Sequence, residues 1–148
     1  MQDGNMKFTE LCHSCIGYNE KYMRRAISEV QNGFYEANIF MEDDITSKNL
    51  VRIHTAIEVR DDELYVDLSA SDDQRSNGLN CPVASTHSMV NFAVKCIFAP
   101  ELPQNHGCDR PVNIKTRLGS ILNPKRPAAV SVRQLTQQGV ADLILKCL

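Results

Sequence analysis

The first feature of this sequence that could do chemistry is a thiol with charged neighbours. Cys108 follows His106-Gly107 and precedes Asp109-Arg110. A nearby cation favours the thiolate, which is the nucleophilic form of cysteine, so Cys108 is a candidate nucleophile. A base and an orienting group would have to converge on it in space. The alternative interpretation is a packed thiol beside a glycine that the turn requires.

Four other polar residues are candidates for binding or catalysis. Arg110 has a planar fork of five donors that suits a carboxylate or phosphate clamp, and a structural salt bridge is the alternative. Asn80, Asn105 and Asn123 all fall in loops rich in Gly and Pro. Side-chain amides in such loops either cap turns or orient a substrate amide. Arg110 is therefore a second catalytic candidate, and the three asparagines are substrate-binding candidates.

Metal ligands are not indicated. Only Cys12-His13-Ser14-Cys15 has metal-like spacing, and a structural zinc site would need a second pair of ligands. The acidic run Glu42-Asp43-Asp44 could bind a divalent cation through oxygen, but a solvated turn explains it as well. His54 and His87 lie far from each other and from His13 in the sequence. We assign no metal ligand and predict no cofactor bound by this chain.

Composition describes an ordinary globular chain. Its 148 residues are 43% hydrophobic and 23% charged, with a formal net charge of -2, so neither nucleic acid nor a membrane surface is an expected partner. The sequence contains no run of about 20 apolar residues and no secretory signal. We expect reduced thiols at the six cysteines and a cytoplasmic location.

A long amphipathic helix is predicted for residues 6–31. Apolar residues recur there at intervals of three or four, which indicates one buried stripe. The stripe comprises Phe8, Leu11, Cys15, Tyr18, Tyr22, Ala26 and Val30. Asn32-Gly33 is expected to end this helix, with Gly33 supplying the positive φ of the cap.

Three antiparallel strands are predicted next. Apolar and polar residues alternate over 51–60, which is typical of a strand with one buried face. Asp61-Asp62 forms a tight turn, and 64–69 is the return strand of a hairpin. Residues 34–41 supply a further extended stretch. Sheet structure therefore follows the first helix.

The remaining chain alternates loops with shorter elements. Residues 71–80 read as a loop, 84–98 as a helix, and 112–116 as a short strand. A final helix begins at about residue 134. The predicted fold class is α+β, with antiparallel strands that include a hairpin, packed by an N-terminal, a middle and a C-terminal helix.

Three stretches, read in order, carry a family pattern, and the third is the most specific because its order and spacing are hard to produce by chance. They are residues 23–44, residues 77–82, and residues 103–130, the last containing Pro-Gln-Asn-His-Gly-Cys-Asp-Arg-Pro-Val at 103–112 and Gly-Ser-Ile-Leu-Asn-Pro at 119–124. Together they resemble the hydantoinase B / 5-oxoprolinase family, which also includes acetone carboxylase alpha-like proteins. The family's domain is several times longer, so residues 1–148 are expected to be a single partial domain from its interior.

The resemblance implies part of an ATP-dependent hydrolase that cleaves C–N bonds in 5-oxoproline- or hydantoin-like rings. It also implies a hydantoinase A-type subunit or domain that binds the nucleotide, with ATP and a divalent metal in the full enzyme. The sequence has no G-x-x-x-x-G-K-[ST] loop and no G-x-S-x-G elbow, so ATP is expected to be bound elsewhere.

Two departures from the family's pattern limit what carries over. The family's metal-binding stretch, with its Gly-Gly-Thr-His-type motif, does not occur here, and residues 131–136 lack the Gly-Asn turn of many relatives. A different branch is therefore indicated. The alternative function is a non-catalytic remnant or partner-binding module of the same family, and a third reading is an independent thiol hydrolase that uses Cys108.

Overall fold

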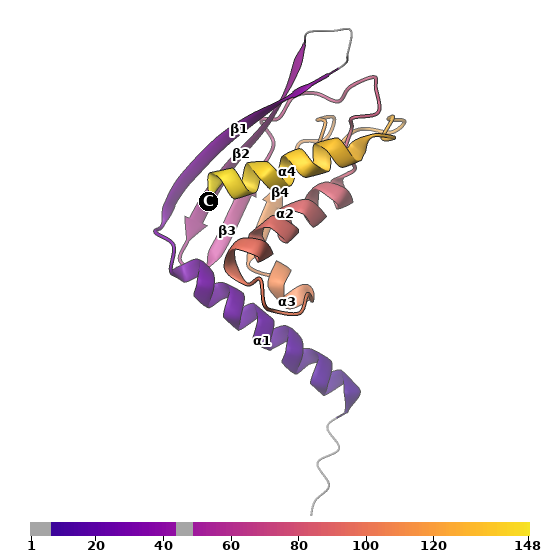
Figure 1. Ribbon diagram of the computed structural model, residues 1–148. Helices are drawn as coiled ribbons and strands as arrows, with labels where there is room; N and C mark the ends of the chain where they lie inside the picture. Colours follow the sequence, from indigo (N-terminus) through magenta and orange to yellow (C-terminus); the bar gives the residue numbers. More distant parts are fainter. Residues whose placement is uncertain (1–6, 44–48) are drawn as a thin grey trace, which may run out of the picture.

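The computed structural model describes residues 7–43 and 49–148, and these segments form an α+β fold as predicted (Figure 1). None of their helices is long and apolar enough to cross a lipid bilayer. In chain order the elements are α1 (Phe8–Ser28), β1 (Gly33–Glu42), β2 (Leu50–Arg60), β3 (Glu63–Asp67), α2 (Val83–Phe98), α3 (His106–Asp109), β4 (Val112–Lys115) and α4 (Arg133–Cys147).

The strands form one sheet in the order β1-β2-β3-β4. Both β1 and β3 run antiparallel to β2, which confirms the predicted antiparallel strands and hairpin. At the hairpin turn Asp61 has a φ of 54°, a left-handed conformation that Asp tolerates better than most residues. β4 instead runs parallel to β3, because the chain crosses over through α2 and α3 before it returns to the sheet.

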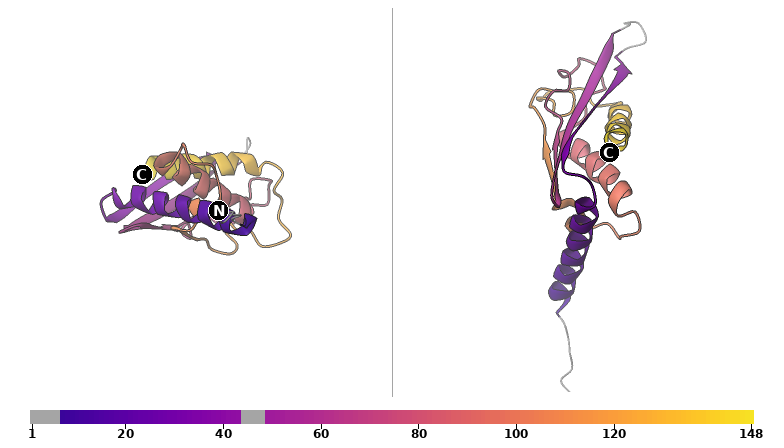
Figure 2. Two further views of the ribbon diagram at one scale, coloured as in Figure 1. Left: turned by 90° about the horizontal axis from the view of Figure 1, so that it is seen from below. Right: turned by 90° about the vertical axis from the view of Figure 1, so that its left-hand side faces the viewer.

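The core lies between one face of the sheet and the helices α2 and α4, which share one side of it (Figure 2). Alternate residues of β2 point into this core: Val51, Ile53, Ile57 and Val59 are almost fully buried. Val90 and Val94 of α2 are buried in the same core. Apolar and polar residues alternate over 51–60 because alternate side chains of β2 face this core.

Two buried threonine hydroxyls tie the long loops to the helices. Thr86 Oγ1, in α2, donates a hydrogen bond of 2.8 Å to the carbonyl of Leu122. Thr136 Oγ1, in α4, donates to the carbonyl of Leu79. A buried carbonyl left unpaired would be costly, so these contacts hold the loops in place around α2 and α4.

The prediction of a buried stripe on α1 is wrong for its first five residues, whereas the last two, Ala26 and Val30, are partly buried. Phe8, Leu11, Cys15, Tyr18 and Tyr22 all face solvent. The helix packs through Asn19, Met23 and Ile27 instead. Periodicity shows that a helix has an apolar face, but α1 has two, and the one that carries Met23 and Ile27 packs against the rest of the fold.

The predicted glycine cap of α1 is also wrong. The helix ends at Ser28, and Glu29 is its C-cap, with its N–H donating to the carbonyls of Ala26 and Ile27. Gly33 does not have a positive φ but begins β1, opposite Val59. A right-handed cap residue ends the helix four residues earlier, so no left-handed glycine is needed there.

Candidate functional site

The candidate residues lie at opposite ends of α2. Asn80 and Asn123 sit in loops near its N-terminus, where the Cys81 N–H donates to the carbonyl of Ile121. Asn105, Cys108 and Arg110 belong to α3 and its two caps, which follow the C-terminus of α2. A 16-residue helix is about 24 Å long. The two groups therefore do not form one site within this chain.

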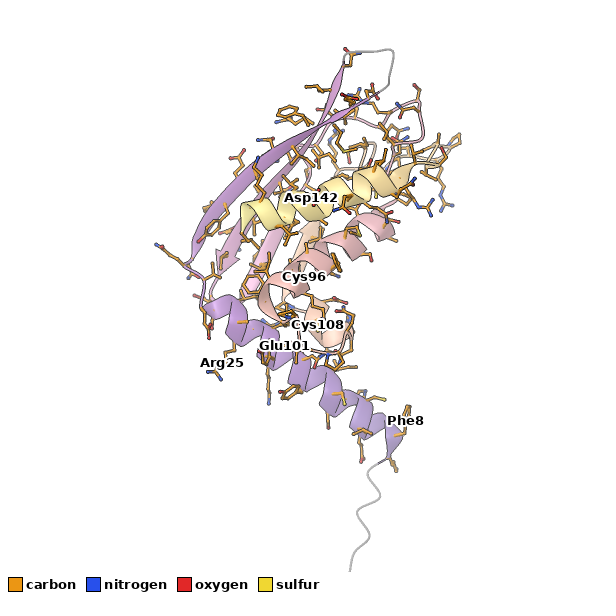
Figure 3. The ribbon with its side chains drawn as sticks, in the orientation of Figure 1. Phe8, Arg25, Cys96, Glu101, Cys108 and Asp142 are labelled. Carbon is orange, nitrogen blue, oxygen red and sulfur yellow. The ribbon has the colours of Figure 1, made fainter. Side chains whose placement is uncertain are left out.

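Cys108 is a buried thiol at the contact between α3 and α1 (Figure 3). Only 2% of its surface is exposed. Asn19 Nδ2 of α1 donates to its Sγ at 3.4 Å and to the carbonyl of Pro103 at 2.6 Å. No histidine forms a hydrogen bond with Sγ in the described segments. This arrangement lacks a nucleophile–base pair, and it supports the interpretation of Cys108 as a packed thiol.

Asn105 and Gly107 fit α3 onto the backbone of α1. Asn105 is the N-cap of α3: its Oδ1 accepts the Gly107 N–H at 2.8 Å, and its Nδ2 donates to the carbonyl of Cys15 at 3.4 Å. A Cβ at position 107 would collide with the carbonyl oxygen of Ile16 and come within 3.0 Å of the Glu20 nitrogen. The motif at 103–112 therefore holds α3 against α1, and we call this contact the dock.

Arg110 completes this dock through an ion pair. Its Nη1 lies 2.7 Å from Glu20 Oε2 on α1, while Arg24 Nε lies 3.1 Å from Glu20 Oε1. Arg24 also reaches Glu63 of β3 at 3.0 Å. The hydrogen bond from Arg110 lowers the pKa of Glu20, with Arg24 adding to the effect. These contacts support the structural salt bridge for Arg110, although its side chain remains partly open to solvent.

Asn80 is fully buried and organises the loops at the other end of α2. Its Nδ2 donates to the carbonyls of Arg75, Asn77 and Ala129 at 2.8, 3.0 and 2.8 Å. Its Oδ1 accepts the Arg75 N–H at 2.7 Å. All of its polar atoms are occupied by backbone, which supports turn capping.

Asn123 has a similar role in a neighbouring turn. Its Nδ2 donates to Thr116 Oγ1 at 3.1 Å, and its carbonyl accepts the Gly119 N–H at 2.8 Å. Gly119 has a φ of 89°, a conformation that favours glycine. The Gly-Ser-Ile-Leu-Asn-Pro stretch is thus a compact turn held partly by Asn123.

A groove with a volume of about 580 Å³ runs along α2 toward the segment that carries the 103–112 motif. It combines the apolar Ala84 and Phe92 with several polar side chains. These are His87, Ser88, Asn91, Lys95, Gln104 and Asp109. Mixed lining of this kind suits a small polar ligand.

Two groups in the groove are shifted toward their uncharged forms. Burial lowers the pKa of His87, and burial raises the pKa of Asp109 against the hydrogen bond that Gln104 donates to it. In the described part of the chain Asn91 Oδ1 is buried without a hydrogen-bond partner. Our sequence reasoning missed this groove. The signal was the spacing of His87, Asn91 and Lys95 at i, i+4 and i+8, opposite the apolar side of the helix.

No three side chains of His, Cys, Asp and Glu gather to hold a metal ion within residues 7–43 and 49–148. Asp43 Oδ1 accepts a hydrogen bond of 2.9 Å from Asn77 Nδ2, whereas Asp44 lies outside the described residues. Of the closely spaced cysteines, Cys12 is partly buried and Cys15 is exposed. The described residues therefore do not fit a divalent metal site.

His54 is a buried residue of the sheet. Its Nε2 lies 2.8 Å from Glu36 Oε1 on β1, and its backbone N–H donates to Ser71 Oγ at 3.1 Å. Only 8% of the residue is exposed. These contacts support the interpretation of His54 as a hydrogen-bonded histidine of the scaffold.

Comparison with known proteins gives a family for the whole chain. The family model described as Hydantoinase B/oxoprolinase matches residues 2–148. An uncharacterized protein of Methanocaldococcus jannaschii is 33% identical over 146 residues, which are 98% of this chain and 25% of that protein. The 5-oxoprolinase of Saccharomyces cerevisiae is 29% identical over 125 residues, 84% of this chain and 10% of the enzyme. The chain thus spans a quarter or less of these relatives.

A solved structure shares the fold. The crystal structure of the ATP-dependent caprolactamase from Pseudomonas jessenii superposes with a TM-score of 0.85 at 23% identity, covering 99% of this chain and 25% of that chain. Every element from α1 to α4 therefore belongs to a fold that also occurs inside a much longer protein.

Proposed function

We propose that this chain, which belongs to the hydantoinase B/oxoprolinase family, is one part of an ATP-dependent hydrolase that opens cyclic amides such as 5-oxoproline or hydantoins. The observation that carries the proposal is the family match over residues 2–148. A 5-oxoprolinase and a caprolactamase among the similar proteins support a ring C–N bond as the target.

The chain supplies only a share of the chemistry in this proposal. An unstrained amide must be activated, by phosphorylation or by a metal-bound water, before it is cleaved. The described residues do not fit a metal site, and the sequence has no phosphate-binding loop. We therefore place ATP on a hydantoinase A-type subunit or domain and the divalent metal outside residues 1–148, which we treat as a single partial domain. No step is assigned to a metal held by this chain.

The groove along α2 is the place where the chain would contact substrate. A cyclic amide presents one N–H donor and one carbonyl acceptor, and the amide of Asn91 can pair with both. Burial lowers the pKa of His87 and so favours the neutral imidazole, which has one donor and one acceptor nitrogen. Asn105 and Asn123 remain loop candidates for a substrate contact outside this groove, whereas the polar atoms of Asn80, the third candidate, are already bonded to backbone. Substituting Asn91 with Ala should raise KM in the complemented enzyme, with Cys96→Ser of the same helix as the control.

The proposal is tested by 5-oxoproline- and hydantoin-dependent ATP hydrolysis. The chain is assayed alone, then with an A-type subunit and the polypeptide that completes the hydantoinase B-type protein. We expect turnover only in the complete mixture. Cys108→Ala and Arg110→Ala are assayed in the same mixture: a catalytic role predicts loss of turnover per folded complex, whereas the docking role predicts lower stability with turnover retained.

A non-catalytic module is the alternative, and the close backbone packing of the 103–112 motif favours it. In that case the chain would bind its partner without any turnover, even in the complete mixture. The six free thiols support the cytoplasmic location that we propose for either function.

A further inference from the structure

The outer face of α1 carries a continuous row of apolar side chains that the fold leaves uncovered. Phe8 is 79% exposed, Leu11 47%, Tyr18 62% and Tyr22 39%, and Cys15 between them is also exposed. Figure 1 and the right-hand view of Figure 2 show the N-terminal end of α1 projecting beyond the sheet, and Figure 3 places Phe8 at that end. These five residues form what we call the α1 seam.

The spacing of the seam is that of a helix-pairing face. Its members follow one another at intervals of three and four residues, which is the a/d pattern of a heptad repeat. Single exposed apolar residues are normal on a protein surface, but a contiguous row of large ones marks a contact. The opposite face of α1 already packs through Met23 and Ile27, so the seam is a second, separate interface.

One flank of the seam is basic. Lys21 and Arg25 each follow a seam tyrosine by three residues, which places them one helical turn away on the same side. Both are exposed, Arg25 points away from the fold in Figure 3, and neither has an ion-pair partner in the described segments. The acidic residues of α1 are engaged elsewhere: Glu20 binds two arginines, and Glu10 accepts the N–H of Lys7. The charge complement of this flank is a carboxylate.

Two lengths, that of the seam and that of the relatives, indicate which polypeptide would cover the seam. The seam spans about 21 Å, roughly four helical turns, which is short for a stable pair of free helices. Relatives that contain this segment are about four times as long as the chain. We propose that the α1 seam binds an amphipathic helix with carboxylates on its flank, belonging to the polypeptide that completes the hydantoinase B-type protein. This inference rests on the proposed function.

Two exposed cysteines provide a direct test. The probe is the part of the Methanocaldococcus jannaschii relative that this chain does not match, produced as a separate polypeptide. Mixtures are alkylated with iodoacetamide, and mass spectrometry compares Cys15, in the seam, with Cys96, which is also exposed and lies on α2 (Figure 3). We expect the probe to slow alkylation of Cys15 roughly tenfold, while the rate at Cys96 stays unchanged.

Matched variants test whether binding at the seam is what protects Cys15 from alkylation. Tyr18→Ser and Lys21→Glu should each weaken probe binding roughly tenfold, whereas Phe92→Ser, an exposed aromatic on α2, should leave it unchanged. If the probe binds but Cys15 stays as reactive as Cys96, the proposed role of the seam is refuted and the proposed function is not. Absence of binding overturns both. Protection of Cys15 in the chain alone, rising with its concentration, shows a second copy in the seam and also overturns the proposal.

Discussion

Replacing Gly107 with Ala should loosen the dock between α3 and α1. The added Cβ would meet the carbonyl oxygen of Ile16 and the amide nitrogen of Glu20, both of which belong to the backbone of α1. Backbone atoms cannot rotate out of the way as a side chain can. The helix as a whole must therefore shift away from α3.

The cost follows from what that shift breaks. Overpacking alone typically costs about 1–3 kcal/mol. Moving α1 also weakens the bonds from Asn19 to Pro103 and Cys108 and the Arg110–Glu20 pair. Each of these contributes about 1 kcal/mol or less net. We expect the free energy of unfolding in urea to fall by about 2–4 kcal/mol.

Gly17→Ala is the matched control, because it lies in the interior of α1 with no atom within 4 Å of the added Cβ. It should stabilise the chain by roughly 0.5–1 kcal/mol through helix propensity. A Gly107→Ala chain as stable as the unmodified one would refute the docking role of the motif.

Three further substitutions test the loops and the groove. Asn80→Asp turns a carboxylate toward three carbonyls and should cost about 3 kcal/mol or more in urea unfolding, and unchanged stability would contradict the turn-capping role. Thr86→Val leaves the Leu122 carbonyl unpaired and should cost about 1–3 kcal/mol, against a near-neutral Thr9→Val on the exposed side of α1. Burial lowers the pKa of His87, so its neutral form contributes stability that is complete above the ordinary value of 6.5 and is lost as the pH falls through the folded-state pKa. Unfolding at a series of pH values should show a smaller acid loss for His87→Gln, and equal loss in both chains would count against a desolvated His87.

The sheet was predictable where the residue pattern itself encodes burial. Residues 51–60 alternate cleanly because one side of β2 faces the core, and the turn at Asp61 suits a residue that tolerates a positive φ. The parallel pairing of β4 was not predictable. The residues of a four-residue strand do not indicate which strand it pairs with. The direction of the pairing depends on how the chain crosses over through α2 and α3.

The α1 helix shows a different limit. Its apolar period correctly predicted a helix, but the same period cannot distinguish a stripe that packs within the chain from one left for another polypeptide. Asn19, a polar residue, is buried together with Met23 and Ile27, because it pairs with Pro103 and Cys108. The burial of a polar side chain such as this one cannot be predicted from the spacing of apolar residues.

The candidate residues stand out by residue type, but the side chains that they contact could not be predicted from the sequence. Cys108 and Arg110 stand out because of their sequence neighbours, yet the groups that they contact, Asn19 and Glu20, lie 89 and 90 residues earlier in the chain. Such partners become visible only when α3 is placed on α1. The groove along α2 was missed because its polar residues are spread over one helical face and form no compact motif.

The central claim, that this chain is a required part of a cyclic-amide hydrolase, is tested most directly by titration. The chain is added in steps to a fixed amount of A-type subunit and completing polypeptide, and 5-oxoproline-dependent ADP formation is measured at each step. The account predicts no turnover without the chain and a linear rise that saturates when the chain is equimolar with its partners. Turnover that is already complete without the chain, or that never appears although the complex forms, would contradict it.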